Sequence, residues 1–140
     1  MFSNDLILLA VAIVIVGIMI FIGISLTNKR GANFDQAAYQ SAFLKIENTL
    51  DQSNLLSYNA VVIDADKLLD KALCEMGVAG KTMGERLKRS GDKFSQLNSV
   101  WYAHKLRNQI AHEHGFRIEY KQAKHALITF RNALKDLGAV

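Results

Sequence analysis

The sequence predicts an all-α protein in which a single N-terminal transmembrane helix precedes a small antiparallel helical bundle. Half of the 140 residues are hydrophobic, and 18 of the 21 residues at positions 6–26 are apolar, with no charge among them. The chain has no proline and is rich in Ala, Leu, Lys and Gln, which favour helices over strands. We therefore expect an anchor with a basic stop at residues 1–30 and a helical domain at residues 31–140.

The apolar segment at residues 6–26 is expected to cross a membrane once. At about 1.5 Å per residue it reaches roughly 31 Å, close to the hydrocarbon thickness of a bilayer. It lacks the basic start and small-residue cleavage site of a signal peptide, so we expect it to be retained. Lys29 and Arg30 follow it, which places the carboxyl-terminal domain on the cytoplasmic side of the inner (cytoplasmic) membrane. A buried core helix is the alternative, but 110 residues are too few to cover one on every side.

Apolar residues at helical spacing predict the first two helices of the domain. The first, at about residues 35–52, has an apolar side chain at every fourth position, and Asp35 complements the helix dipole at its start. The second, at about residues 55–76, carries a longer apolar stripe and ends at Gly77. Cys74 lies on the apolar side of this helix, and we expect its side chain to be buried.

Capping and stop residues delimit three further helices. Thr82 and Glu85 have the spacing of a capping box, and a Ser-Gly pair after them ends a short helix at about residues 82–90. The next helix covers residues 96–114 and is closed by a glycine, and the last covers about residues 119–138. The predicted bundle therefore consists of helices joined by short turns.

Charge is divided between the two halves of the domain. Residues 35–76 carry 3 basic and 7 acidic residues, whereas residues 77–140 carry 12 basic and 5 acidic residues. A polyanion such as RNA is one partner for the basic half, and a solvated helical surface or anionic lipid headgroups are the alternatives. The candidate RNA-binding residues are Lys105, Arg117, Lys121 and Lys124.

The cysteine and histidine content argues against a metal site, and we expect no cofactor. A single cysteine excludes an internal disulfide framework and a cysteine-rich zinc fold, and it suits a reducing compartment. His112, Glu113 and His114 are adjacent on a helix, where neighbouring side chains point apart. We therefore expect no metal ligands among them.

The predicted helix at residues 96–114 is apolar on two faces. One face carries Leu97, Val100, Trp101 and Ala111, and the other carries Ala103, Leu106 and Ile110. A helix in a small domain buries two faces when it is central or when its second face meets another chain. We therefore expect this helix to form a surface for self-association, which predicts a homodimer.

The same helix carries the side chains with the most distinctive chemistry. His104, Asn108 and His112 follow one another at four-residue spacing in one polar strip. Arg107 lies about 140° from His112 around an ideal helix, so its long side chain or a second copy has to bring the two groups together. Carbonyl groups at the helix end favour a protonated His112, and an arginine offers forked donors to a phosphate oxygen. Because RNA supplies its own 2′-hydroxyl nucleophile, these two groups suit metal-free phosphodiester cleavage.

The six residues from Arg107 to His112, Arg-Asn-Gln-Ile-Ala-His, match the R-x4-6-H signature of HEPN domains. The helix order resembles that family over roughly residues 40–138. The resemblance implies a helical domain that dimerises so that two motifs face one cleft, and in many members a metal-independent endoribonuclease. It implies that Arg107 and His112 are the catalytic pair and that Asn108 orients them. The toxin branch that pairs with nucleotidyltransferase antitoxins usually has a tyrosine two residues after the histidine, where this chain has His114, which argues against that branch. An antitoxin or another protein is nevertheless among the partners that the resemblance allows.

Other interpretations of these residues stay open. Arg107 could pair with Glu113 or Asp136 while His112 caps the helix end. The protein is then a non-catalytic helical adaptor, or an assembly module, at the cytoplasmic membrane face, and not an endoribonuclease. A structural subunit of a larger membrane assembly is a third possibility, which predicts an apolar patch outside the dimer surface.

Overall fold

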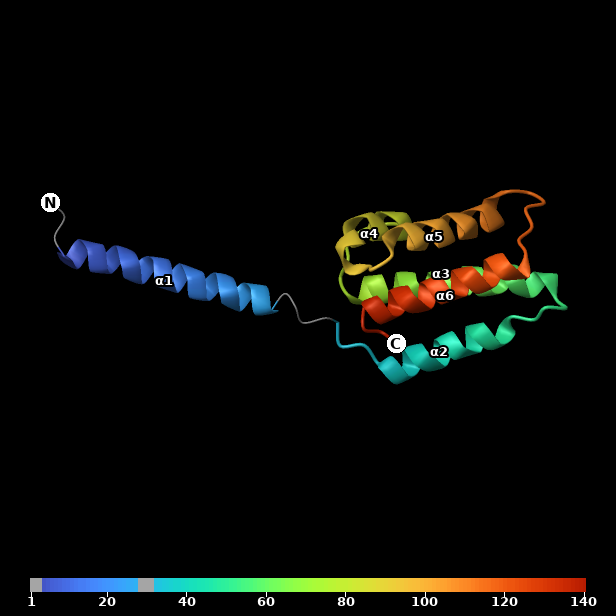
Figure 1. Cartoon of the computed structure of the whole chain (residues 1–140), viewed down its shortest axis with the longest axis horizontal. Coiled ribbons are helices and arrows are strands. Elements are labelled where there is room, and N and C mark those ends of the chain that lie inside the picture. Colours follow the sequence, from blue (N-terminus) through green and yellow to red (C-terminus); the bar gives the residue numbers. More distant parts are fainter. Residues whose placement is uncertain (1–3, 28–31) are drawn as a thin grey trace. The chain divides into compact units, whose positions relative to one another are not determined.

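The computed structural model describes residues 4–27 and 32–140, and every regular element in these ranges is a helix (Figure 1). The chain divides into two compact units, residues 1–33 and 34–140. The predicted all-α class, with one apolar N-terminal helix followed by a helical bundle, is confirmed.

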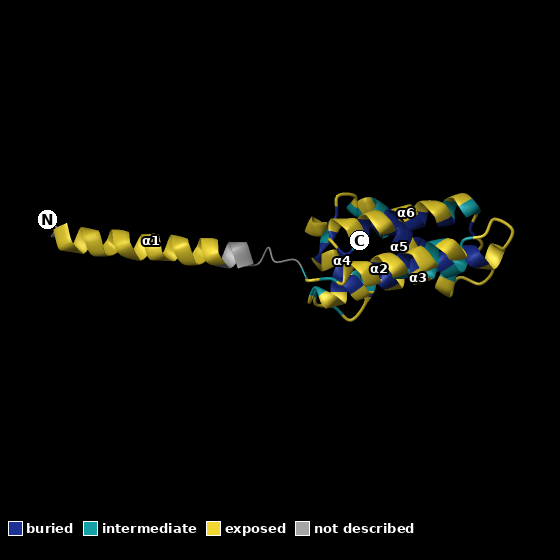
Figure 2. Ribbon diagram, turned by 90° about the horizontal axis from the view of Figure 1, so that it is seen from below, coloured by how far each residue is buried: buried dark blue, intermediate teal, exposed yellow. Residues whose placement is uncertain are grey.

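The first unit contains α1, Asn4–Thr27. Its segment Asn4–Gly23 has a mean hydropathy of 3.2, and none of that segment is buried (Figure 2). Twenty helical residues rise about 30 Å, so α1 is long and apolar enough to cross a bilayer. A signal sequence has the same length and composition near an N-terminus. The predicted basic stop, Lys29 and Arg30, lies outside the described residues.

Side chains cap the first two helices of the second unit, α2 (Gln36–Thr49) and α3 (Leu55–Glu75). The Asp35 carboxylate and the Asn54 side-chain oxygen each accept a hydrogen bond of 3.0 Å from an amide in the first helical turn. α2 is shorter than predicted, because Leu50 already has an extended backbone. Both helices begin within one residue of the predicted starts.

α3 ends at the glycine that the sequence predicts. Gly77 has a φ of 75°, and the amide of Val78 donates to the carbonyl of Leu73 at 3.0 Å, as in a Schellman motif. The prediction that Cys74 is buried is wrong, because its side chain is exposed. Leu69 and Leu73 lie one turn apart on the buried face, and Cys74 lies about 100° further around the helix.

The remaining elements are α4 (Met83–Arg89), the 3-10 helix η1 (Gly91–Lys93), α5 (Leu97–His112) and α6 (Tyr120–Asp136). The Thr82 hydroxyl accepts from the amide of Glu85 at 3.2 Å, as the predicted capping box requires. The Glu85 carboxylate accepts from the amide of Lys81 at 2.7 Å and not from that of Thr82, so only the first of the two capping-box hydrogen bonds forms. At the start of α6, the Gln122 side chain accepts from the amide of Glu119 at 2.9 Å. No pattern in the sequence indicates η1.

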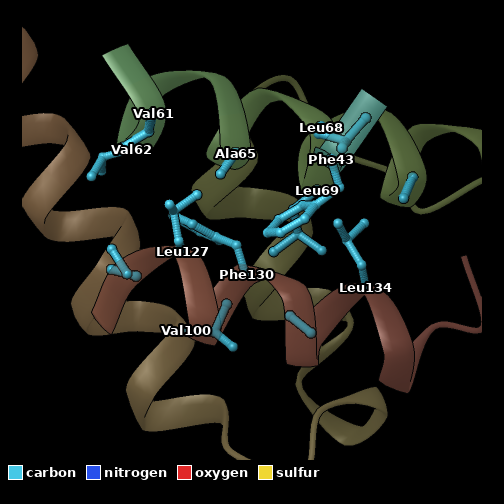
Figure 3. Packing of buried hydrophobic residues seen from close by; sticks show 14 of the residues in the cluster. Phe43, Val61, Val62, Ala65, Leu68, Leu69, Val100, Leu127, Phe130 and Leu134 are labelled. Atoms are coloured by element: carbon cyan, nitrogen blue, oxygen red, sulfur yellow. The ribbon is translucent and has the colours of Figure 1, made fainter. Parts of the chain in front are cut away.

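α3 is the central helix of the bundle, and it contacts α2, α4, α5 and α6. In Figure 1, α2, α3, α5 and α6 alternate in direction, which makes the bundle antiparallel. Apolar side chains of α6 meet those of α3 in the core (Figure 3), among them Leu127, Phe130 and Leu134 from α6 and Val62, Ala65 and Leu69 from α3. Phe130, Leu69 and Leu134 are fully buried.

Helix α5 buries residues of both predicted apolar faces inside its own chain. Val100 from one face and Ala103 and Leu106 from the other are at most 3% exposed, and α5 contacts both α3 and α6. Ala111, in contrast, is exposed. Because the bundle itself covers these positions, the two apolar faces no longer argue for a second copy, and the homodimer stays a prediction.

Candidate functional site

One open pocket brings together most of the predicted site residues. It has a volume of about 750 Å³ and is lined by α3, α4, α5 and the segment before α4. Arg107, Asn108, His112 and Lys105 all line it. A second hollow of about 530 Å³ shares Lys105, Asn108 and His112 with the first. Asn108 and His112 of the polar strip predicted on this helix therefore border open space, whereas His104, the first residue of the strip, is buried.

A buried carboxylate of α3 lies beneath the pocket. Asp66 is 3% exposed, and its Oδ1 lies 2.8 Å from Nδ1 of His104, which is 7% exposed. The Oδ2 of Asp66 lies 3.5 Å from Nε of Arg107. A charged group this deeply buried needs polar partners, and Asp66 finds both of them on α5. The carboxylate thus holds two successive turns of α5 against α3.

Asn108 connects the same two side chains on the pocket side. Arg107 Nη1 donates to Asn108 Oδ1 at 3.1 Å, and Asn108 Nδ2 lies 3.3 Å from His104 Nε2. Asp66, His104, Asn108 and Arg107 therefore form a closed circuit of contacts, which we call the polar ring. The resemblance implies that Asn108 orients the Arg107–His112 pair; in the structure its side chain contacts Arg107 and His104.

The alternative pairings predicted for Arg107 are wrong. Its carboxylate partner is Asp66, whereas Asp136 accepts hydrogen bonds of 2.8 Å from the amide and the hydroxyl of Ser95. Glu113 accepts a hydrogen bond from a side chain one turn earlier at 3.3 Å. Arg107 Nε lies 3.5 Å from Asp66 but makes no hydrogen bond within the described residues, and the side chain is still 26% exposed.

His112 is the last residue of α5 and is exposed. The backbone amide of Glu113 donates to the carbonyl of Gln109 at 2.9 Å, so the backbone and not the imidazole closes this helix end. Within residues 4–27 and 32–140, no hydrogen bond or ion pair fixes the His112 ring. The imidazole is therefore available to a molecule in the pocket.

An ion pair closes the α4 side of the pocket. Arg86 of α4 is 9% exposed, and its Nε and Nη2 donate to the two carboxylate oxygens of Asp70 at 2.7 and 2.9 Å. Arg86 also donates to the carbonyl of Gly80. The hydrogen bonds with Asp70 raise the pKa of Arg86 above its ordinary value. Its donors point into the protein, so this arginine fixes α4 to α3.

The pocket is cationic on balance. Two carboxylates line it, those of Asp66 and Asp70, against the basic side chains of Lys67, Lys81, Arg86, Lys105 and Arg107. Of the predicted RNA-binding residues, only Lys105 is among them. Arg117 lines a separate hollow of about 370 Å³ at the end of the bundle. Lys121 and Lys124 are exposed on α6 and line neither hollow beside α5.

Sequence reasoning missed Asp66, the residue on which the polar ring depends. The sequence position of Asp66 indicates that it is buried, because Asp66 follows Ala65 directly and precedes Leu69 by three positions in the buried stripe of α3. Aspartate is rarely buried without a partner, so a carboxylate at the edge of such a stripe calls for a cation or donor from another helix. Which helix supplies that partner depends on the packing of α3 against α5.

The arrangement suits chemistry at a phosphate group. A free imidazole can carry a proton, and a guanidinium whose Nη2 group has no partner within the described residues can donate to an anion. The surrounding lysines attract a polyanion without specifying its sequence. In the described part of the chain, no three His, Cys, Asp or Glu side chains gather in a way that would hold a metal ion.

Comparisons of this chain with protein-family models, with curated proteins and with solved structures found no match.

Proposed function

We propose that this chain is a membrane-anchored, HEPN-like endoribonuclease that cleaves RNA without a metal ion and acts as a homodimer. One observation carries the proposal: an open cationic pocket is lined by three residues of the six-residue motif, Arg107, Asn108 and His112, together with Lys105. α1 would hold the enzyme at the inner membrane with its domain in the cytoplasm.

Each group has a defined task in the proposed reaction. Neutral His112 takes the proton of the 2′-hydroxyl as the 2′-oxygen attacks the neighbouring phosphorus. Arg107 binds the phosphate oxygens, whose negative charge grows in the transition state. The bond from phosphorus to the 5′-oxygen then breaks, and the proton passes from the imidazolium to that oxygen. The products are a 2′,3′-cyclic phosphate and a 5′-hydroxyl end.

The test uses the full chain in detergent micelles, a labelled single-stranded RNA and EDTA in the buffer. We expect the wild-type protein to cut the RNA, and we expect His112→Ala to lower the rate by at least about 100-fold, because general acid–base catalysis contributes about that much. Arg107→Ala should impair cleavage similarly. His125→Ala is the matched control, because His125 is an exposed histidine of α6 that lines neither hollow. Equal cutting by wild type and His112→Ala would contradict the proposal.

A non-catalytic adaptor is the second candidate, and one observation favours it. Leu55 and Leu56, at the start of α3, are 63% and 78% exposed. They line the hollow of about 370 Å³ together with Phe116. Exposed neighbouring apolar side chains are typical of a protein contact surface. An adaptor predicts that RNA stays intact while Leu56→Ser abolishes recruitment of a protein partner to the membrane.

A further inference from the structure

The polar ring contacts two of the three nitrogens of the Arg107 guanidinium. Nε lies 3.5 Å from Asp66 Oδ2, which is an ion-pair contact, but Nε is buried and makes no hydrogen bond within the described residues. Nη1 donates to Asn108 Oδ1 at 3.1 Å. Nε and Nη1 lie on opposite sides of the planar group, so these contacts restrict its rotation and leave Nη2 without a partner in the described part of the chain. The side chain as a whole is 26% exposed.

The hydrogen-bond pattern of the ring is consistent with a single assignment of donors. His104 places Nδ1 against the Asp66 carboxylate, which can only accept, so Nδ1 carries a proton. In a neutral imidazole Nε2 is then an acceptor, and it requires the amide nitrogen of Asn108. That orientation leaves Asn108 Oδ1 to accept from Arg107. Asp66 therefore acts on Arg107 directly, and also indirectly through His104 and Asn108.

We propose that Asp66 and His104 are positioning residues that fix the guanidinium of Arg107 and leave its Nη2 group free for a molecule in the pocket. This inference rests on the proposed function for its consequence in catalysis, but the fixation of Arg107 is a property of the folded chain alone. Neither residue has to touch the substrate, because both are more than nine-tenths buried.

Asp66→Asn tests the inference with little change in volume. An amide presents one oxygen and one NH₂ group, so either orientation loses the contact to His104 or the attraction to Arg107. His104→Asn is a second variant that tests the indirect connection. The asparagine side chain at position 104 can keep the contact to Asp66 but is too short to reach Asn108. Asp70→Asn is the matched control. It removes one carboxylate one turn further along α3, breaks the pair with Arg86, and leaves the polar ring intact.

The first readout does not require activity. The full chain in detergent micelles is labelled with 15N-arginine, and the Arg107 signals are assigned by their loss in Arg107→Lys. A fixed guanidinium gives separate signals for its two Nη groups, whereas free rotation merges them. We expect separate signals in the wild type and in Asp70→Asn, and merged signals in Asp66→Asn and His104→Asn. Merged signals in the wild type, separate signals in Asp66→Asn, or equal merging in Asp66→Asn and Asp70→Asn would overturn the inference.

The second readout is the cleavage kinetics of the same variants on single-stranded RNA. Misplacing a transition-state contact lowers turnover, so we expect kcat to fall by about 10- to 100-fold in Asp66→Asn. We expect KM to change by less than about twofold, because the exposed lysines that bind the RNA backbone are unchanged. A variant that is merely unfolded would lose RNA binding as well. If the wild type does not cut RNA while the arginine signals behave as expected, the nuclease proposal fails and the positioning role of Asp66 stands.

Discussion

The ion pair between Arg86 and Asp70 offers the most quantitative test of the fold around the pocket. The side chains are 10% and 28% exposed, and two hydrogen bonds of 2.7 and 2.9 Å join them. Asp70→Asn removes the negative charge and leaves the Arg86 guanidinium buried without a counter-charge. The double variant Asp70→Leu with Arg86→Met replaces the pair by apolar side chains of similar size.

The expected magnitude follows from the burial of the pair. Removing one partner of a fully buried ion pair costs about 3–5 kcal/mol of stability, because the remaining charge is desolvated. Asp70 is partly exposed, so water and the Gly80 carbonyl stabilise Arg86 in the variant, and we expect a loss of about 2 kcal/mol. For a domain of this size, that loss corresponds to a fall in Tm of about 10 °C. The double variant should lie within about 3 °C of the wild type, because a buried pair contributes little relative to apolar packing.

The assay is thermal unfolding of the full chain in detergent, followed by the fluorescence of the protein's single tryptophan. Trp101 lies on α5 and lines the pocket, so its signal reports unfolding of the bundle and not of α1. A fall in Tm of less than about 3 °C in Asp70→Asn would refute the reasoning, as would a double variant no more stable than the single one.

The apolar core and the buried Tyr39 hydroxyl give two further predictions. Phe130→Ala should lower the free energy of unfolding by about 3–5 kcal/mol, because this fully buried ring fills the contact between α6 and α3. Denaturant unfolding measures the loss, and a value below about 1 kcal/mol would contradict this packing. Tyr39→Phe should leave Tm unchanged or raised at pH 8, because the buried Tyr39 hydroxyl makes no hydrogen bond within the described residues. Burial raises the pKa of Tyr39 above its ordinary value, so the wild type should lose stability as the pH rises above about 10. The advantage of Tyr39→Phe should then grow between pH 8 and pH 11, and a constant difference would count against this burial.

Local sequence chemistry was enough to locate the helices. Asp35 and Asn54 accept hydrogen bonds at helix starts, and Gly77 has the positive φ that a helix end favours. These features depend on residues only a few positions apart, so they can be recognised without knowing the fold. The exception is η1, because a 3-10 turn of three residues has no periodic pattern.

The candidate site was only partly predictable. Arg107, Asn108 and His112 were identified from their spacing on one helix together with the resemblance of residues 107–112 to the HEPN signature, and they line one pocket. Asp66 was missed because it lies on another helix, and only the packing of α3 against α5 brings it to Arg107. The prediction that Cys74 is buried was wrong because an apolar stripe locates the buried face of a helix only to within about one residue position, which is 100° around the helix.

The claim that Arg107 and His112 carry phosphodiester chemistry is tested most directly by the rate at which RNA ends with a 2′,3′-cyclic phosphate form in EDTA. We predict that wild type and His125→Ala form these ends at the same rate, and that His112→Ala forms them at least about 100-fold more slowly. If the ends never form with the wild-type chain, or form equally fast with His112→Ala, then the pocket beside α5 is not a nuclease site.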